Sequence, residues 1–352
     1  MQTSPNLKIV ENSRSLPSAS TAQTNTAKTG VLLINLGTPE ATDFKSVRRY
    51  LKQFLSDKRV VESRGLLWWL VLNGIILRKR PKSSGKAYDL IWNRELDESP
   101  LKTVTRAQAA ALAPLFQADN IIVDWAMRYG KPSIDDILQK MTNMGCNKIL
   151  LFPLYPQYSG ATTGTAMDNV FDVLKTMRHQ PTIRMVAPYF DQDAHIKALA
   201  NSIQTHHASL NWQPEVTIAS LHGLPVDFIK KGDPYQQQCE RTVTLLREQL
   251  ELTDKQMLLS YQSRSGRTEW IGPDTEETLI RLAKSGVKNL TIIAPGFATD
   301  CIETLEELKI RAVNTFLGAG GENCSVIPCL NDSTESINML KTLIDANLRD
   351  WV

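Results

Sequence analysis

The sequence lacks an apolar run long enough to cross a membrane as a helix. Its longest apolar stretch, LLWWLVLNGIIL at residues 66–77, has twelve residues, whereas a helix needs about 20 to span the bilayer core. The first 28 residues also lack the apolar core of a secretory signal and are polar throughout. We therefore expect no membrane-spanning segment, and a disordered tail over residues 1–28.

Cysteine is scarce and an excess of charge is missing. The five cysteines form no CxxC pair, so neither a disulfide framework nor a zinc site is indicated. The 40 Lys and Arg residues nearly balance the 37 Asp and Glu residues, for a formal net charge of +3. That balance gives no reason to expect nucleic acid as a partner. We expect a cytoplasmic protein.

Short apolar runs rich in β-branched residues recur along the chain and predict strands. Most run on without polar alternation, which indicates burial on both faces of a sheet. Helical patterns closed by a glycine lie between most of them, as at residues 133–145 and 275–286. Alternating strands and helices predict parallel sheets in an α/β fold. The expected strands are residues 30–37, 120–128, 147–155, 182–190, 216–223, 257–264, 289–297 and 324–330.

The two halves of the chain repeat the same order of features. An Arg-x-Gly step, a helix, a glycine and a strand follow one another from Arg128 and again from Arg264. A chance likeness between two α/β units is the alternative, but the repeat favours two similar Rossmann-like, doubly wound domains. We place these domains at 29–190 and 191–330, with a C-terminal helix at 331–352 that packs back on the first domain. Ligands of such folds bind beyond the carboxyl ends of the strands, in a cleft between the domains.

Three carboxylates follow the seventh expected strand. Asp300, Glu303 and Glu307 are spaced i, i+3 and i+7 in PGFATDCIETLEEL, which predicts one face of a helix lining the cleft. The alternative is that Asp300 and Glu303 form a capping box.

The fifth expected strand ends on His222. Gly223 and Pro225 follow, which allows a tight turn that exposes the imidazole at the strand end. Beside carboxylates, that imidazole is a metal ligand or a base; the alternative is a satisfied polar residue at the edge of the core. We expect the other histidines on the surface: His179, His195, His206 and His207.

Aromatic and small polar residues fill the other strand-end loops and predict a wall for a flat, apolar ligand, unless these tyrosines only bridge core and solvent. The residues are Tyr129, Tyr155, Tyr158, Thr162 and Thr163.

The apolar stretch at 66–77 runs directly into a cluster of cations. Trp68, Trp69 and Leu72 precede Arg78, Lys79, Arg80 and Lys82. An exposed patch of this kind suits an apolar ligand that carries carboxylates, or an anionic membrane. The alternative is a core helix followed by a solvated basic loop.

These motifs together resemble the ferrochelatase family, whose members insert Fe²⁺ into protoporphyrin IX as the last step of haem synthesis. The resemblance extends from about residue 30 to the C-terminus. The motifs that carry it are VLLINLGTPE, YLKQFLSD, MRYGKP, FPLYPQYS, SLHGLP, YQSRSG, WIGPDTEETL and PGFATDCIETLEEL.

The resemblance implies the chelatase form of the two-domain fold and roles for individual residues. His222 and Glu303 would face each other across the porphyrin cleft, as proton acceptors or iron ligands. Asp300 and Glu307 would extend an acidic track behind them. The residues implied to contact the porphyrin are Arg128, Tyr129, Phe297, Trp68, Trp69, Leu72, Arg80 and Ser99.

The resemblance also sets expectations about cofactors and partners. Fe²⁺ is a substrate and no cofactor is permanently bound. We expect no iron–sulfur cluster, because the cysteine-rich tail of animal members is missing and Gly160 stands where some bacterial members have a cluster ligand. Cys301 stands where several relatives have a histidine, so no metal role is carried over to it. A monomer is favoured, with peripheral contact to the inner face of the membrane through the apolar stretch.

Other functions remain open at this stage. A coproporphyrin or sirohydrochlorin chelatase differs only in substrate, and the long apolar stretch favours the more apolar protoporphyrin. A non-catalytic porphyrin-binding or metal-binding protein would lack turnover. A glycosyltransferase is disfavoured because no glycine-rich phosphate loop follows any strand; LGTPE, the nearest candidate, contains one glycine.

Overall fold

Two parallel sheets form the centre of the molecule. The computed structural model describes residues 28–62, 65–266 and 268–351, so the predicted tail lies outside the described residues except for Lys28, which begins the first strand. The first sheet has the order β2-β1-β3-β4 and the second the order β6-β5-β7-β8. The strands are β1 (Lys28–Gly37), β2 (Ile121–Tyr129), β3 (Cys146–Pro153), β4 (Thr182–Met185), β5 (Val216–His222), β6 (Met257–Gln262), β7 (Asn289–Ile293) and β8 (Asn323–Val326).

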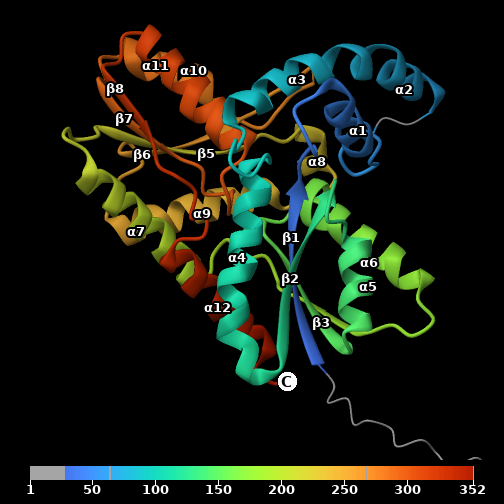
Figure 1. Ribbon diagram of the computed structural model, residues 1–352. Coiled ribbons are helices and arrows are strands. Elements are labelled where there is room, and N and C mark those ends of the chain that lie inside the picture. The colour runs from blue at the N-terminus through green and yellow to red at the C-terminus, as the bar shows by residue number, and fades with distance from the viewer. Residues whose placement is uncertain (1–27, 63–64, 267, 352) are drawn as a thin grey trace, which may run out of the picture.

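The fold confirms the prediction of eight strands and of a repeated unit. All described strand pairs are parallel, and both sheets have the same strand order. The central strand β1 buries Val31, Leu32, Leu33 and Ile34 completely, as expected for a sheet that helices cover on both faces. The two sheets are therefore the centres of two similar α/β domains (Figure 1).

Helices cover both sheets. The two helices predicted before β3 and β7 are present as α5 and α10, and Ser133 and Asp274 cap their N-termini. From residue 100 onward the helices are α4 (Pro100–Phe116), η2 (Gln117–Asp119), α5 (Ile134–Asn143), η3 (Gly160–Gly164), α6 (Thr165–Thr176), α7 (Asp193–Ser209), α8 (Val226–Lys230), α9 (Tyr235–Leu250), α10 (Thr275–Lys284), η4 (Glu303–Ala312), α11 (Val313–Gly318) and α12 (Thr334–Leu348).

A helical insertion lies beyond the carboxyl end of β1 (Figure 1). It consists of α1 (Phe44–Leu55), α2 (Leu66–Val71), the π-helix η1 (Leu72–Ile76) and α3 (Leu77–Ile91). We call residues 66–77 the lip. Five of its apolar side chains are more than half exposed: Leu66, Leu67, Trp69, Leu70 and Ile75. The apolar stretch is therefore largely a surface patch, and within the described residues no helix is long and apolar enough to cross a membrane.

Two helices, α4 and α12, pack against each other between the domains. In Figure 1, α4 and α12 lie between the two sheets. Gln108 on α4 donates from Nε2 to the carbonyl of Asn331 at 2.7 Å, and Lys341 on α12 lies 5.2 Å from the ring centroid of Phe116 on α4. The C-terminal helix thus packs against a helix of the first domain, while the domain boundaries given above stay predictions.

One histidine is in the core, contrary to the sequence-based expectation. His195 on α7 is 2% exposed, because α9 and α12 both cover α7. Neither ring nitrogen has a hydrogen-bond partner among the described residues, and the ring packs edge to face on Tyr189 at 5.2 Å. His206 and His207 are half-buried and contact the hydroxyl groups of Ser325 and Thr291.

The buried imidazole predicts a loss of stability in acid. Burial lowers the pKa of His195 from 6.5 to about 3, so between these values the unfolded chain binds a proton that the folded chain does not. The free energy of unfolding should therefore fall with decreasing pH, by about 1.4 kcal/mol per pH unit from this group. Urea unfolding at a series of pH values measures the slope.

A His195→Phe variant provides the comparison, since it fills the same space without a titrating group. In this variant the free energy of unfolding should change less steeply with pH, by the contribution of one bound proton. His206 and His207, whose pKa values burial also lowers, remain and account for part of what is left. Equal slopes in the two proteins would contradict the assignment to His195.

Candidate active site

A cavity of about 580 Å³ lies between the two domains, a volume that fits a mid-sized organic ligand. The ends of β1, β3, β5 and β6 and the loop after β7 contribute residues to its wall. This is where an α/β fold is expected to bind a ligand, because the carboxyl ends of parallel strands meet there. The insertion adds an apolar side, made by Phe54, Leu55, Val60 and Val61.

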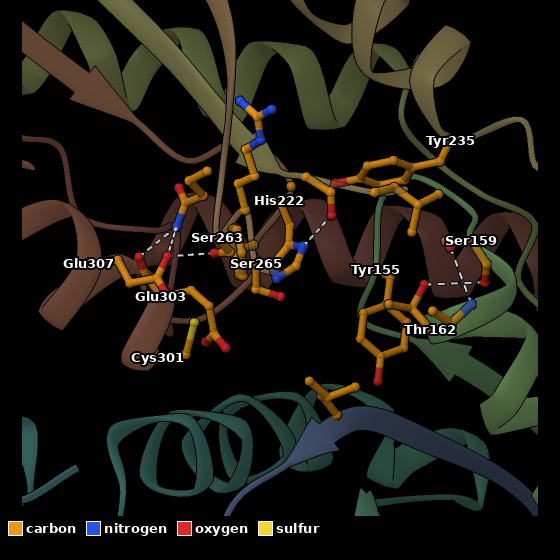
Figure 2. Close-up of a pocket in the computed structure, with 18 of the residues that line it drawn as sticks. Tyr155, Ser159, Thr162, His222, Tyr235, Ser263, Ser265, Cys301, Glu303 and Glu307 are labelled. Atoms are coloured by element: carbon orange, nitrogen blue, oxygen red, sulfur yellow. Dashed lines mark hydrogen bonds between the residues drawn. The ribbon is translucent and has the colours of Figure 1, made fainter. Parts of the chain in front are cut away.

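His222 reaches this cavity from the end of β5, as predicted (Figure 2). Its Nδ1 lies 2.6 Å from the carbonyl oxygen of Gly223. A carbonyl oxygen only accepts hydrogen bonds, so this contact assigns the proton to Nδ1. The lone pair of Nε2 is then open. Gly223 makes the turn possible, because a Cβ there would lie 2.8 Å from the carbonyl oxygen of Gln262.

Glu303 and Glu307 line the same cavity, but on a π-helix where an α-helix was expected. Residues four apart still share a face, so both carboxylates lie on the side of His222 (Figure 2). Glu307 accepts hydrogen bonds from Ser263 Oγ and, at 3.5 Å, from Gln262 Nε2. Arg311 pairs with Glu307 at 3.2 Å and is half-exposed. The carboxylates thus lead from the cavity toward solvent.

The surroundings of Glu303 favour its protonated form. Burial raises the pKa of Glu303, and the negative charge of Glu307 raises it further, while His222 acts in the opposite direction. Glu303 therefore binds a proton more readily than a solvated glutamate. An imidazole with an open lone pair and a carboxylate of raised proton affinity are suited to proton removal from a ligand, or to holding a cation.

Asp300 does not extend this pair. Its Oδ2 accepts from Asn331 Nδ2 at 2.7 Å and its Oδ1 from Thr304 Oγ1 at 2.8 Å, and it does not line the described cavity. Asp300 does not share the predicted helix face with Glu303 and Glu307, because η4 begins only at Glu303, after a loop that turns Asp300 toward Asn331. The alternative, a capping box of Asp300 and Glu303, is not formed either, since no side chain caps the N-terminus of η4.

Arg128 and Tyr129 are turned away from the cavity. Both contact Asp57 Oδ2, at 2.5 Å from Arg128 Nη2 and 2.9 Å from the Tyr129 hydroxyl. Tyr129 is fully buried, and neither residue lines the described cavity. An acidic partner thus holds both side chains outside the described cavity, and their contact with a flat ligand stays a prediction.

Some of the remaining predicted contact residues line the cavity and others do not. Phe297 and Arg80 line the cavity, and so do Tyr155 and Thr162 among the predicted wall residues. Ser99 is buried, caps α4 and lines a smaller hollow that also reaches Glu303. The predicted residues outside the described cavity are Trp68, Trp69, Leu72, Tyr158 and Thr163; of these Leu72 is buried and Trp69 is exposed.

The structure adds three wall residues that the sequence analysis did not predict to contact a ligand. Ser263, Trp270 and Cys301 all line the cavity. Ser263 has φ 66°, a conformation that non-glycine residues adopt rarely and that is often found at functional sites. Trp270 Nε1 and the Tyr155 hydroxyl are buried and have no hydrogen-bond partner among the described residues. The available signal was the strand-end motif YQSRSG, which precedes Trp270.

The cavity offers few ligands for a resident metal. Within residues 28–62, 65–266 and 268–351, no group of three or more His, Cys, Asp or Glu side chains is placed to hold a metal ion. The five cysteines are free thiols. Burial raises the pKa of Cys301, so this wall residue presents a neutral thiol.

Sequence comparison gives matches over almost the whole chain. A sequence model of the ferrochelatase family matches residues 28–348. Ferrochelatase of Rhodopseudomonas palustris strain HaA2 is 51% identical over 326 residues, which cover 92% of this chain and 94% of the relative. Ferrochelatase of Bradyrhizobium sp. strain BTAi1 is 49% identical over 348 residues, 99% of this chain and 98% of the relative.

Comparison with solved structures gives the same fold at low sequence identity. SirB from Bacillus subtilis with Fe³⁺ aligns with a TM-score of 0.53 at 12% identity, over 91% of this chain and 96% of that one. The sirohydrochlorin chelatase SirB from Bacillus subtilis subspecies spizizenii, in complex with cobalt, aligns with a TM-score of 0.51 at 11% identity, over 92% and 97%. At such identity the likeness concerns the fold alone.

Proposed function

Because this chain belongs to the ferrochelatase family, we propose that it binds protoporphyrin IX in the cleft and that His222 and Glu303 carry out the insertion of Fe²⁺. The protein is a lyase whose family acts on a porphyrin and ferrous iron. Fe²⁺ is a substrate of this reaction, and the products are protohaem and two protons. The observation that carries the proposal is the open Nε2 of His222 beside the raised proton affinity of Glu303.

The two residues have complementary tasks in this proposal. The pyrrole nitrogens must lose two protons before they can bind Fe²⁺. His222 Nε2 takes one proton from the ring and Glu303 takes the other. Glu307, which is closer to solvent and paired with Arg311, then receives protons from the inner site and releases them. The charges balance, since the ring dianion formed on loss of two protons binds one divalent cation.

The walls fit a flat apolar ring with charged substituents. Phe297, Tyr155 and the apolar side from the insertion provide surface for the macrocycle. Arg80 lines the cavity without a carboxylate partner among the described residues, so its guanidinium is available to a propionate.

The test is anaerobic insertion of Fe²⁺ or Zn²⁺ into protoporphyrin IX, followed by the change in absorbance. Coproporphyrin and sirohydrochlorin are assayed beside it, and we expect the apolar walls to give protoporphyrin the highest kcat/KM. Faster turnover of coproporphyrin would assign that substrate instead. Tight porphyrin binding without metallation would favour the non-catalytic binding protein.

The proposal includes a monomer without an iron–sulfur cluster. Sedimentation of the purified protein tests the monomeric state. Analysis of its iron and sulfide content tests the absence of a cluster.

We also propose that the lip contacts the inner face of an anionic membrane. Its exposed leucines and Trp69 lie beside the exposed cations Arg78, Lys79 and Lys82, a combination that binds anionic lipid surfaces. Leu67→Glu should weaken binding to vesicles of phosphatidylglycerol and phosphatidylcholine about tenfold or more. In the wild type an apolar side chain is buried in the membrane surface, whereas in the variant a charged side chain would have to be buried there. Co-sedimentation measures the binding.

The matched control is Phe171→Glu. Phe171 is 50% exposed on α6, outside the lip, so this variant should bind vesicles as the wild type does. Equal binding by wild type and Leu67→Glu would contradict membrane contact through the lip.

A further inference from the structure

Asp57 lies between α1 and the lip, in the segment that forms the apolar side of the cleft. We propose that Asp57 is a positioning residue: it holds this wall in place for the porphyrin and is the residue through which Arg128 and Tyr129 act. The inference rests on the proposed function, since the ligand that the wall orders is the porphyrin.

The carboxylate of Asp57 is bound by an unusual number of donors. Its Oδ2 accepts from Arg128 Nη2 at 2.5 Å, from the Tyr129 hydroxyl at 2.9 Å and from Thr165 Oγ1. Its Oδ1 accepts from the backbone N–H of Arg59 at 2.8 Å. The side chain is 9% exposed, so these bonds are shielded from water and charge-assisted. Burial by itself raises the pKa of Asp57, but the hydrogen bonds from Thr165, the Arg59 backbone and Tyr129 outweigh it and the net shift is downward.

The donors and the wall belong to different parts of the fold. Arg128 and Tyr129 are on β2 and Thr165 is on α6, so all three belong to the sheet and helix of the first domain. Asp57 belongs to the insertion. Asp57 Oδ2 therefore joins the insertion to both β2 and α6.

The residues on either side of Asp57 form the wall. Phe54 and Leu55 before it and Val60 and Val61 after it all line the cavity, while Asp57 itself points into the domain. The ring of Phe54 packs edge to face on Tyr129 at 5.2 Å. Asp57 is thus an anchor in the middle of a stretch that presents four apolar side chains to the ligand.

The other anchors of this segment are weaker. Arg59 pairs with Asp168, and Glu62 pairs with Lys231 of the second domain. All four side chains are at least 40% exposed, and exposed ion pairs contribute little to stability.

Without Asp57, the stretch keeps its apolar packing on the cluster of Tyr50, Leu55 and Tyr129 and these exposed ion pairs. Porphyrin binding would then have to supply part of its order, which costs binding free energy that a preorganised wall does not.

The experiment compares porphyrin affinity in Asp57→Asn with that of the wild type. The dissociation constant of protoporphyrin IX is measured by fluorescence titration, without metal. We expect it to rise about tenfold in Asp57→Asn, as for a binding wall that is no longer preorganised. With saturating porphyrin, kcat and the KM for Zn²⁺ should change by less than about threefold, because His222 and Glu303 are on other elements.

Asp124→Asn is the matched control for a general loss of stability. Asp124 is on the same strand as Arg128, its side chain is 13% exposed and it pairs with Lys140 at 2.8 Å. This variant also removes a paired, largely buried carboxylate, but it does not line the cavity or contact the insertion. Its porphyrin affinity should match that of the wild type.

Tyr129→Phe, made alone and together with Asp57→Asn, tests how Tyr129 acts. If the Tyr129 hydroxyl acts through Asp57, Tyr129→Phe weakens porphyrin binding in the wild-type protein. The same substitution then has no further effect on binding in the Asp57→Asn protein. Should Asp57→Asn fail to fold, Thr165→Val removes one donor and leaves the charge pair, and a smaller rise in the dissociation constant is expected.

Three results would overturn the inference. These are unchanged affinity in both Asp57→Asn and Thr165→Val, an equal loss in Asp124→Asn, and an equal effect of Tyr129→Phe in both backgrounds. A wild type that binds porphyrin but never metallates it would instead contradict the proposed function, and the comparison of dissociation constants would still decide the role of Asp57.

Discussion

Replacing His222 with alanine is expected to lower the rate of metal insertion into protoporphyrin IX by about 10³-fold. The imidazole is placed at the end of β5 with its Nδ1 proton directed to the Gly223 carbonyl, which leaves Nε2 to accept a pyrrole proton. Alanine offers no acceptor there. The rate is measured by absorbance under anaerobic conditions with Fe²⁺, and with Zn²⁺ as a redox-stable substitute.

His179→Ala is the matched control for this variant. His179 is exposed and does not line the cavity, so its removal should leave the rate within about twofold of the wild type, as for most surface substitutions. Porphyrin binding by the His222→Ala protein, followed by fluorescence, shows whether the cleft is intact. A His222→Ala enzyme that retains most of its turnover would exclude His222 as the proton acceptor.

Replacing Glu303 with glutamine is expected to lower the rate by about 100-fold. Glutamine keeps the size of the side chain but accepts no proton. Burial and the charge of Glu307 raise the pKa of Glu303 above the ordinary 4.5. Because the ionised form is the one that accepts a pyrrole proton, the wild-type rate should fall with decreasing pH, starting above the range in which a solvated carboxylate titrates. The glutamine variant should lose this part of the pH profile.

Glu306→Gln separates this effect from a general change in the π-helix. Glu306 is on the same helix and pairs with Arg311 at 3.0 Å, but it does not line the cavity. Its replacement should leave both the rate and the pH profile within about twofold of the wild type. If Glu306→Gln and Glu303→Gln are equally slow, the loss comes from the helix and not from the carboxylate in the cavity.

The strands and the repeat could be predicted from the sequence because both depend on local patterns. Apolar runs such as VLLINLG at 31–37 have no polar face, so they must be buried on both sides, and the structure has them in the sheets. The strand-end position of His222 follows from the same logic, since the turn residues after it mark where the strand stops.

The direction of charged side chains could not be predicted in this way. Spacing placed Asp300 with Glu303 and Glu307, but Asn331, 31 residues further along the chain, binds the Asp300 carboxylate in another direction. Likewise Arg128 lies at the carboxyl end of β2, yet Asp57 at a separation of 71 residues holds it outside the cavity. The π-helical geometry of η4 also has no signature in the spacing of its carboxylates.

By itself, the sequence determined where the strands lie, that they repeat, and which residues stand at their carboxyl ends, because these features are governed by the hydrophobicity and turn chemistry of neighbouring residues. The tertiary structure alone decided which of those residues face the cavity. A side chain takes the direction of its best partner, and for Asp300, Arg128 and Tyr129 that partner comes from a distant segment. His222 and Glu303 stay in the cavity, because no side chain from a distant segment turns them away from it.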